Sequence, residues 1–380
     1  MGWNDGRFPI SLAAAKEAGS AKTALRWGQG GDDESAGEAV VSTPWWEPGS
    51  FAQRRGFLEG RARILKALRL WFEGEGFIEV DTPALQISPG LEPHLKAFAT
   101  WLETPEGDKR LRYLHTSPEF TMKKLLVAGM DRIYQLGHVF RNGEKAGTHS
   151  PEFTMAEWYR TGAAYTDLMA DCAGLMRAAC RAAGTTEFRF RGRTCDPFQP
   201  YEVLTVPGAF QRHCGIDLLA TEEQVDRLAA AAAPIGIAKH EGDSWEDLFF
   251  RIMLDRIEPH LGMGVPTMLA DYPVSMAALS RPKPEEPRLA ERFELYACGV
   301  ELANGFGELT DAAVQRARFE ADMDLKQRLY GERYPIDEDF LAALELGMPA
   351  ASGIALGVDR LVMLATQAPS IDAVLWAPVM

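Results

Sequence analysis

Cationic side chains cluster in a short loop between two apolar segments, at Arg141, Lys145 and His149. Residues 133–159 predict a strand, a polar loop and a second strand. Arg141 directly follows the apolar end of the first strand, so a rigid backbone holds its guanidinium opposite the other two groups. The pattern predicts an anion clamp, although an ordinary hairpin with a charged tip explains the spacing equally well.

The second strand places an acid in an apolar row. Side chains alternate between the faces of a strand, so Phe153, Met155, Glu157 and Tyr159 share one face. Both faces are largely apolar, and an unpaired buried charge is costly. Glu157 therefore needs a cationic partner, and a ligand is one candidate for it.

Two further acids, Glu301 and Glu308, flank the residues 304–307, whose glycines predict a bend between two apolar segments. Magnesium prefers oxygen ligands and is often held by one or two carboxylates together with phosphate oxygens. The pair therefore fits a magnesium ion. Surface acids beside a bend fit the spacing as well.

Two predicted helix starts also carry polar groups. Arg360 lies in the first turn after a strand that ends at Gly357, near the positive end of the helix dipole and in reach of a phosphate. A surface arginine is the alternative. Ser117, Pro118 and Glu119 have the residue types of an N-cap, a first helical position and a first turn. They form a simple cap, or else Glu119 points across the sheet towards a ligand amine.

The elements that must position these groups follow from hydrophobic periodicity. A helix over residues 54–74 precedes a strand over 77–80 and Pro83, and an antiparallel pair covers 95–102 and 111–115. A helix spans 166–182, and residues 187–265 are expected to form a mainly helical insertion. Strands return at 266–273, 292–309 and 352–358.

The amino-acid composition is typical of a globular enzyme. The 380 residues are 46% hydrophobic, as in a globular enzyme, and 40 basic against 54 acidic residues give a net charge of -14. No block of Lys and Arg indicates a nucleic-acid surface. Five scattered cysteines without a CxxC pair fit reduced thiols in a cytoplasm. Residues 1–44 are expected to be a flexible tail, and no signal peptide or membrane span is predicted.

Together, the arginines, acids and Phe153 suggest an ATP site without a Walker loop or a GxGxxG motif. The order of segments resembles that of class II aminoacyl-tRNA synthetases. The resemblance is closest to the catalytic core of lysyl-tRNA synthetase and to the related ligases that attach (R)-β-lysine to elongation factor P. It runs from about residue 45 to the C-terminus through HTSPEFTMKKLLVAG, FRN, HSPEFTMAEWY, ELANGFGELTD and GVDRLVML.

Two features favour the elongation factor P ligases over the tRNA enzymes. The N-terminal segment contains no alternating strands for an anticodon-binding barrel. Ala355 stands where the tRNA enzyme has glycine, and an added methyl group can change which position of the substrate amine fits. A truncated lysyl-tRNA synthetase and a regulatory paralogue without catalysis remain as alternatives, and intact Arg141, Arg360, Glu301 and Glu308 argue against the latter.

The resemblance implies an α+β fold with an antiparallel sheet flanked by helices in residues 45–380, a homodimer formed through residues 64–83, and ATP-dependent formation of an aminoacyl adenylate. Arg141 and Arg360 would be the catalytic residues, and Glu301 and Glu308 would carry Mg²⁺. The ATP-binding set would be Arg141, Asn142, Gly143, His149, Ser150, Phe153, Glu301, Leu302, Gly357 and Arg360. The set that binds lysine or β-lysine would be Ser117, Pro118, Glu119, Glu157, Tyr159, Glu308 and Ala355.

The sequence departs from the synthetase pattern at two positions. The usual Arg-Asn-Glu reads Arg141-Asn142-Gly143-Glu144 here, so the group that contacts the adenine amine is open, with the Gly143 backbone as one candidate. Ser150 stands where asparagine is common. Both changes concern the hydrogen bonds to ATP.

Overall fold

The computed structural model describes residues 44–379, so the predicted tail lies outside the described residues except for Pro44. The helices are α1 (Pro48–Gly74), α2 (Glu119–Val127), α3 (Tyr165–Ala183), α4 (Val206–Cys214), α5 (Val225–Ala232), α6 (Trp245–Ile252), α7 (Ala312–Tyr330), α8 (Glu338–Gly347) and α9 (Val358–Thr366). The strands are β1 (Ile78–Glu79), β2 (Leu85–Gln86), β3 (Phe98–Glu103), β4 (Lys109–Leu114), β5 (Arg132–Phe140), β6 (Glu152–Thr161), β7 (Phe188–Phe190), β8 (Arg193–Cys195), β9 (Glu202–Thr205), β10 (Thr267–Pro273), β11 (Leu289–Ala297), β12 (Val300–Gly307) and β13 (Ala351–Gly357). None of the described helices combines the length and the apolar composition that crossing a bilayer requires.

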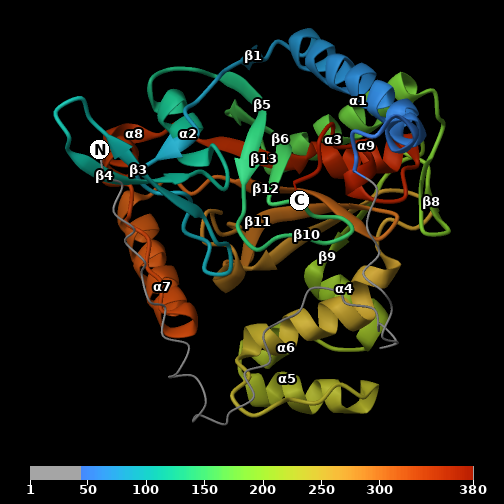
Figure 1. Cartoon of the computed structure of the whole chain (residues 1–380). Coiled ribbons are helices and arrows are strands. Elements are labelled where there is room, and N and C mark those ends of the chain that lie inside the picture. The colour runs from blue at the N-terminus through green and yellow to red at the C-terminus, as the bar shows by residue number, and fades with distance from the viewer. Residues whose placement is uncertain (1–43, 380) are drawn as a thin grey trace, which may run out of the picture. The chain divides into compact units, whose positions relative to one another are not determined.

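An eight-stranded sheet organises the described chain, in the order β1-β5-β6-β13-β12-β11-β10-β9 (Figure 1). The six inner strands pair antiparallel, and only the outermost pairs, β1 with β5 and β9 with β10, are parallel. The α+β fold with an antiparallel sheet flanked by helices is thereby confirmed. A separate three-stranded sheet has the order β2-β4-β3.

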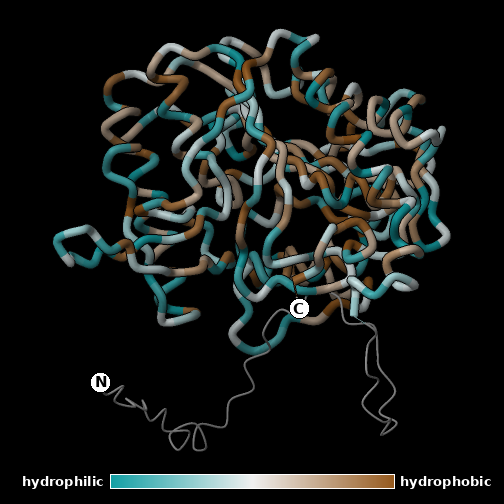
Figure 2. The backbone as a smooth tube through the Cα atoms, turned by 45° about the horizontal axis from the view of Figure 1, so that its top comes forward, coloured by the Kyte–Doolittle hydropathy of each residue, from teal (hydrophilic) through white to brown (hydrophobic). Residues whose placement is uncertain are grey.

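One face of the large sheet is covered by α1, α3 and α9, which contact one another and the strands beneath. Ala156 and Trp158 of β6 and Leu356 of β13 point into this core and are almost fully buried. Phe72 of α1 stacks on Tyr134 of β5, with the ring centroids 4.2 Å apart. In Figure 2 the hydrophobic positions concentrate along the central strands and the helices over them. Of the two faces of the second strand, the one with Ala156 and Trp158 is therefore covered by helices.

The region predicted as a mainly helical insertion, residues 187–265, contains both helices and strands. α4, α5 and α6 lie together in Figure 1 around a hydrophobic core of their own. β7 and β8 form a small hairpin, and β9 pairs with β10 at the edge of the large sheet. The insertion therefore also extends the central sheet.

The predicted bend at residues 304–307 is wrong, because these residues lie inside the continuous strand β12. The turn lies earlier, at Cys298 and Gly299, which both have positive φ. Gly305 is required by packing, since a Cβ there would come within 2.8 Å of the Phe293 ring. Likewise, α2 begins at Glu119, one residue later than expected.

Candidate active site

The pairing of neighbouring strands places several polar residues side by side on the sheet face opposite α1, α3 and α9. Glu157 of β6 pairs with Ala355 of β13, Ala355 with Asn304 of β12, and Asn304 with Glu294 of β11. Directly paired residues project to the same side, with Cβ atoms about 5 Å apart. The row places the predicted substrate residues Glu157 and Ala355 next to each other.

Strand β13 carries small residues on that polar face. Gly353, Ala355 and Gly357 alternate with the buried Ile354 and Leu356. A methyl group at Gly353 would overlap both the Tyr159 ring and Oε1 of Glu308. The absence of a side chain at Gly353 therefore allows Tyr159 and Glu308 to approach each other. The sequence analysis did not identify Gly353.

Arg141 lies directly after β5 and is weakly held. Its Nε donates to the Thr116 carbonyl at 3.4 Å, and its guanidinium carbon is 5.3 Å from the centroid of the Phe153 ring. Within residues 44–379 these are the contacts its guanidinium makes. A cation with so few partners, placed on an aromatic ring, suits an anionic ligand that bears a planar base.

Arg360, in the first turn of α9, reaches the same loop. Its guanidinium donates to the carbonyls of Thr148 (3.2 Å) and Glu301 (2.9 Å) and to Nε2 of His149 (2.5 Å). The proximity of Arg141 also lowers the pKa of His149. The two arginines therefore converge around His149, as an anion clamp requires.

His149 is neutral in this arrangement. Burial and the neighbouring Arg360 and Arg141 lower the pKa of His149 to about 4. The expectation of a second cationic group at this position is therefore wrong, because two guanidinium groups disfavour a third positive charge. His149 instead accepts a hydrogen bond that orients Arg360. Lys145 is exposed and contacts the carbonyl of Val379.

The other residues predicted to bind ATP occupy two environments. Asn142 and Gly143 form an exposed turn in which Gly143 has φ +84°, a conformation that favours glycine. Ser150 is buried in the same loop. The Leu302 side chain packs in the apolar core, so only its backbone faces the clamp. Gly357 forms the N-cap of α9.

Glu301 and Glu308 lie seven residues apart on and just after β12 and contact different cations. Oε2 of Glu301 is 3.6 Å from the Arg360 guanidinium, beside the clamp. Oε2 of Glu308 is 2.5 Å from the ammonium of Lys123, at the other end of the polar face. In the described chain the two acids are therefore not drawn into one cluster, and residues 44–379 contain no group of three or more His, Cys, Asp or Glu placed to hold a metal.

Three buried carboxylates form a second part of the site. They are Glu119 at the start of α2, Glu157 on β6 and Glu308 after β12. Glu157 accepts hydrogen bonds from the hydroxyls of Ser117 (2.6 Å) and Tyr159 (2.7 Å). The cationic partner expected for Glu157 is absent from the described residues, and two hydroxyl groups take its place. A ligand ammonium would complete the arrangement.

Burial dominates the electrostatics of this acidic pocket, defined as Glu119, Glu157, Glu308 and Tyr159. It raises the pKa of Glu157 to about 8, with Glu119 adding to the effect. It also raises the pKa of Glu308, although the neighbouring Lys123 opposes the shift. The pKa of Tyr159 lies well above its usual value because of burial and the surrounding acids. The acids of the pocket thus outnumber the one ammonium that contacts them, which is that of Lys123.

Lys123 is the residue that the sequence analysis missed. It is fully buried on α2, where its ammonium contacts Glu119 and Glu308. The i, i+4 spacing from Glu119 to Lys123 was a usable signal, but the same spacing is common on exposed helices.

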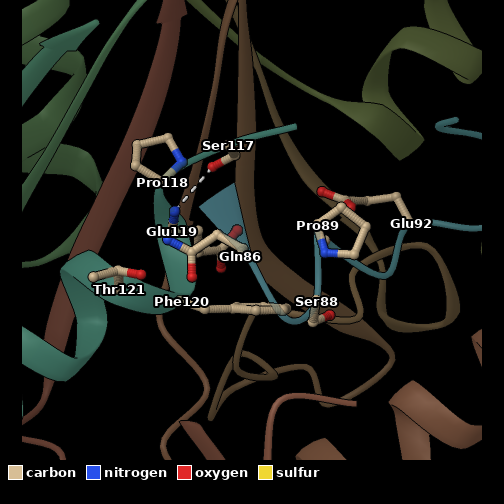
Figure 3. A pocket seen from close by; sticks show the side chains of 10 residues that line it. Gln86, Ser88, Pro89, Glu92, Ser117, Pro118, Glu119, Phe120 and Thr121 are labelled. Atoms are coloured by element: carbon tan, nitrogen blue, oxygen red, sulfur yellow. Dashed lines mark hydrogen bonds between the residues drawn. The ribbon is translucent and has the colours of Figure 1, made fainter. Parts of the chain in front are cut away.

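A pocket opens beside the start of α2 and contains three of the predicted substrate residues, Ser117, Pro118 and Glu119 (Figure 3). Its opposite wall comes from β2 and the following loop and includes Glu92. The Ser117 hydroxyl accepts a hydrogen bond from the Glu119 backbone N–H at 3.1 Å, as drawn in Figure 3. Ser117 is nevertheless not the N-cap that was predicted, because Pro118 occupies that position, and the Ser117 hydroxyl donates to Glu157.

The site therefore has a cationic end and an acidic end on one face of the sheet. The cationic end, with Arg141, Arg360 and Phe153, suits a nucleotide phosphate and base. The acidic end suits a small ligand that carries ammonium groups. Such an arrangement can bring a carboxylate of the small ligand up to a phosphate of the nucleotide.

Comparison with known proteins agrees with this geometry. The family model for class II tRNA synthetases (D, K and N) matches residues 51–380. An elongation factor P--(R)-beta-lysine ligase of Proteus mirabilis is 38% identical over 88% of this chain and 97% of the relative, and one of Edwardsiella ictaluri is 41% identical over 83% and 92%. A lysine--tRNA ligase of Pelotomaculum thermopropionicum is 37% identical over 85% of this chain but 63% of the relative. The chain belongs to the class II tRNA synthetase family and is an ATP-dependent amino-acid ligase of that family.

Proposed function

We propose that the chain activates (R)-β-lysine, or lysine, with ATP and transfers the activated amino acid to a lysine side chain of elongation factor P in the cytoplasm. The observation that carries the proposal is the acidic pocket, where three carboxylates face one buried lysine and a dication would restore the balance. A diamino acid with two ammonium groups supplies that charge. The names and the coverage of the relatives support the same reaction.

In the first step the substrate carboxylate attacks the α-phosphorus of ATP. An O–P bond forms, the bond from the α-phosphorus to the bridging oxygen breaks, and pyrophosphate leaves with the electron pair. A carboxylate is already a nucleophile and needs alignment rather than a base. We assign Arg141 to the α-phosphate and Arg360, oriented by His149, to the outer phosphates, with Phe153 under the adenine.

Glu301 and Glu308 are oxygen donors of the kind that magnesium prefers. Oε1 of Glu308 has no hydrogen-bond partner among the described residues, so this carboxylate keeps an oxygen for a cation, whereas Glu301 lies apart beside Arg360. A bound Mg²⁺ would neutralise phosphate charge. We assign Glu301 to the outer-phosphate end and Glu308 to the end near the amino acid, because they contact different cations here.

At the amino-acid end we assign Glu119, Glu157 and Tyr159 to the substrate ammonium groups, with Ser117 and Pro118 alongside. Ala355 lies directly opposite Glu157, so its methyl group limits where an amine can sit. This favours β-lysine over α-lysine. In the second step the ε-amine of the acceptor lysine attacks the adenylate carbonyl, an amide bond forms, and AMP leaves.

The relationship to a lysine--tRNA ligase keeps charging of tRNA with α-lysine as a second candidate. ATP–pyrophosphate exchange with α-lysine and (R)-β-lysine, followed by transfer to purified tRNA and to elongation factor P, separates the candidates. We expect faster exchange with β-lysine, labelled elongation factor P and uncharged tRNA. Charged tRNA would favour the second candidate, and no exchange with either amino acid would contradict both.

A further inference from the structure

Lys123 is unusual because a fully buried ammonium costs much unless carboxylates pair with it. It contacts Glu119 one turn earlier on the same helix, and it lies 2.5 Å from Oε2 of Glu308, which comes from a different element. Its other neighbourhood is apolar, with the Phe340 ring 6.0 Å away. The charge thus bridges two acids of the pocket.

Both carboxylates that Lys123 holds belong to the acidic pocket. Oε1 of Glu308 remains without a hydrogen-bond partner, and Glu157 is bonded only to hydroxyl groups in the described chain. Lys123 therefore occupies one oxygen of Glu119 and one of Glu308, and other carboxylate oxygens of the pocket stay available to a ligand. Once a bound ammonium has released the proton from Glu157, three carboxylates and one ammonium leave two negative charges to match the ligand.

We propose that Lys123 is a positioning residue of the amino-acid pocket. Its ammonium fixes Glu119 and Glu308 and sets the pocket to accept a small ligand with two ammonium groups. The inference rests on the proposed function, since it assigns the charge balance of that same site. Lys123 has no direct contact with the reacting atoms in this assignment.

The test compares Lys123→Met with Lys124→Met in ATP–pyrophosphate exchange with lysine and (R)-β-lysine. Lys124 is the next residue of α2, but it is 29% exposed and pairs with Asp337 at 2.8 Å, away from the pocket. For Lys123→Met we expect the KM for both amino acids to rise on the order of tenfold to a hundredfold, because two acids lose their buried partner. The KM for ATP should stay unchanged, and Lys124→Met should behave like the wild type.

A conservative variant distinguishes a charge effect from a packing effect. Lys123→Arg keeps a cation beside Glu119 and Glu308, so the amino-acid KM of Lys123→Arg should lie closer to that of the wild type than the KM of Lys123→Met does.

An unchanged amino-acid KM in folded Lys123→Met, or an increase that is just as large in Lys123→Arg, would overturn the proposal. Should Lys123→Met fail to fold, Lys123→Gln, which retains a donor for one carboxylate, takes its place, and its amino-acid KM should rise as well. Failure of the proposed function looks different, because the wild type itself would then show no exchange that depends on lysine or β-lysine.

Discussion

At the scale of single residues, Arg141 shows how a weakly held group can matter more for rate than for stability. Its contacts in the described chain are one long hydrogen bond and one aromatic ring, worth about 1 kcal/mol together. An arginine that neutralises charge in phosphoryl transfer is worth on the order of 10³-fold or more in rate. The two effects are therefore separable.

We expect Arg141→Ala to lower kcat/KM for pyrophosphate exchange by on the order of 10³-fold while thermal unfolding shifts by only a few degrees. Arg132→Ala, at the exposed start of β5, is the matched control, since its guanidinium donates to the Glu75 carbonyl away from the clamp. Normal exchange in the Arg141 variant would refute the role assigned to this residue.

The Glu157 carboxyl links substrate binding to pH. Its pKa of about 8 means that the free enzyme holds a proton there at pH 7, and a bound ammonium favours release of that proton. We expect the KM for lysine to fall as pH rises from about 6 to about 8.5, by at most about tenfold per pH unit. In Glu157→Gln the KM should be higher and less dependent on pH.

The free energy of unfolding should fall as pH rises, whereas the affinity for lysine should increase. The folded-state pKa of Glu157 lies above the ordinary value of 4.5, so its contribution to folding is complete below about pH 4.5 and is lost as pH rises through about 8. Between pH 5 and 8 the free energy of unfolding should therefore decline more steeply in the wild type than in Glu157→Gln, as measured by urea denaturation. Parallel declines would argue against a proton on Glu157.

At the scale of elements, β13 is notable for having no large side chain on its polar face. Gly353 lies between the Tyr159 ring and Glu308, and an added methyl group would overlap both. We expect Gly353→Ala to raise the KM for the amino acid strongly, because Tyr159 or Glu308 must move, while ATP still binds at the clamp. Titration with a fluorescent ATP analogue, beside exchange kinetics, checks this. Equal loss of both affinities would indicate collapse of the sheet instead.

The elements also show where sequence reasoning succeeds and fails. The strand β6 and its two faces could be predicted from the alternation of side chains, because one face packs against helices and the other faces the site. The bend at residues 304–307 was wrong because glycine was interpreted as a turn signal, whereas Gly305 makes room for Phe293. Lys123 and Lys124 are adjacent and chemically identical in the sequence. Only tertiary packing buries the first and leaves the second partly exposed.

At the scale of the whole molecule, the sequence predicted which residues form the site better than it predicted their protonation states. The motifs assigned Arg141, Arg360 and the acids to one site, and the strand register pairs Glu157 with Ala355. The lowered pKa of His149 depends on burial and on Arg360 and Arg141, and burial and the approach of Arg360 arise only in the folded chain. Charge states are properties of the assembled site.

The remaining whole-molecule question concerns assembly. Large apolar side chains stay exposed on α1, β1 and the segment around β2, including Leu70 and Ile78 at 57% each and Ile87 at 46%. β1 is also an edge strand of the large sheet. Exposed apolar residues beside an open edge are typical of an interface between copies. We therefore propose a homodimer formed through this region.

We expect the wild-type chain of 41.9 kDa to sediment as a dimer and Ile78→Lys to sediment as a monomer at the same concentration. A two-fold interface contains each residue twice, and each aliphatic side chain removed from it costs about 1.5 kcal/mol or more. The dissociation constant should therefore rise about a hundredfold or more. Leu346→Lys is the control, because Leu346 on α8 is 82% exposed but lies on a different element. A monomeric wild type, or a dimeric Ile78→Lys, would remove this region as the interface.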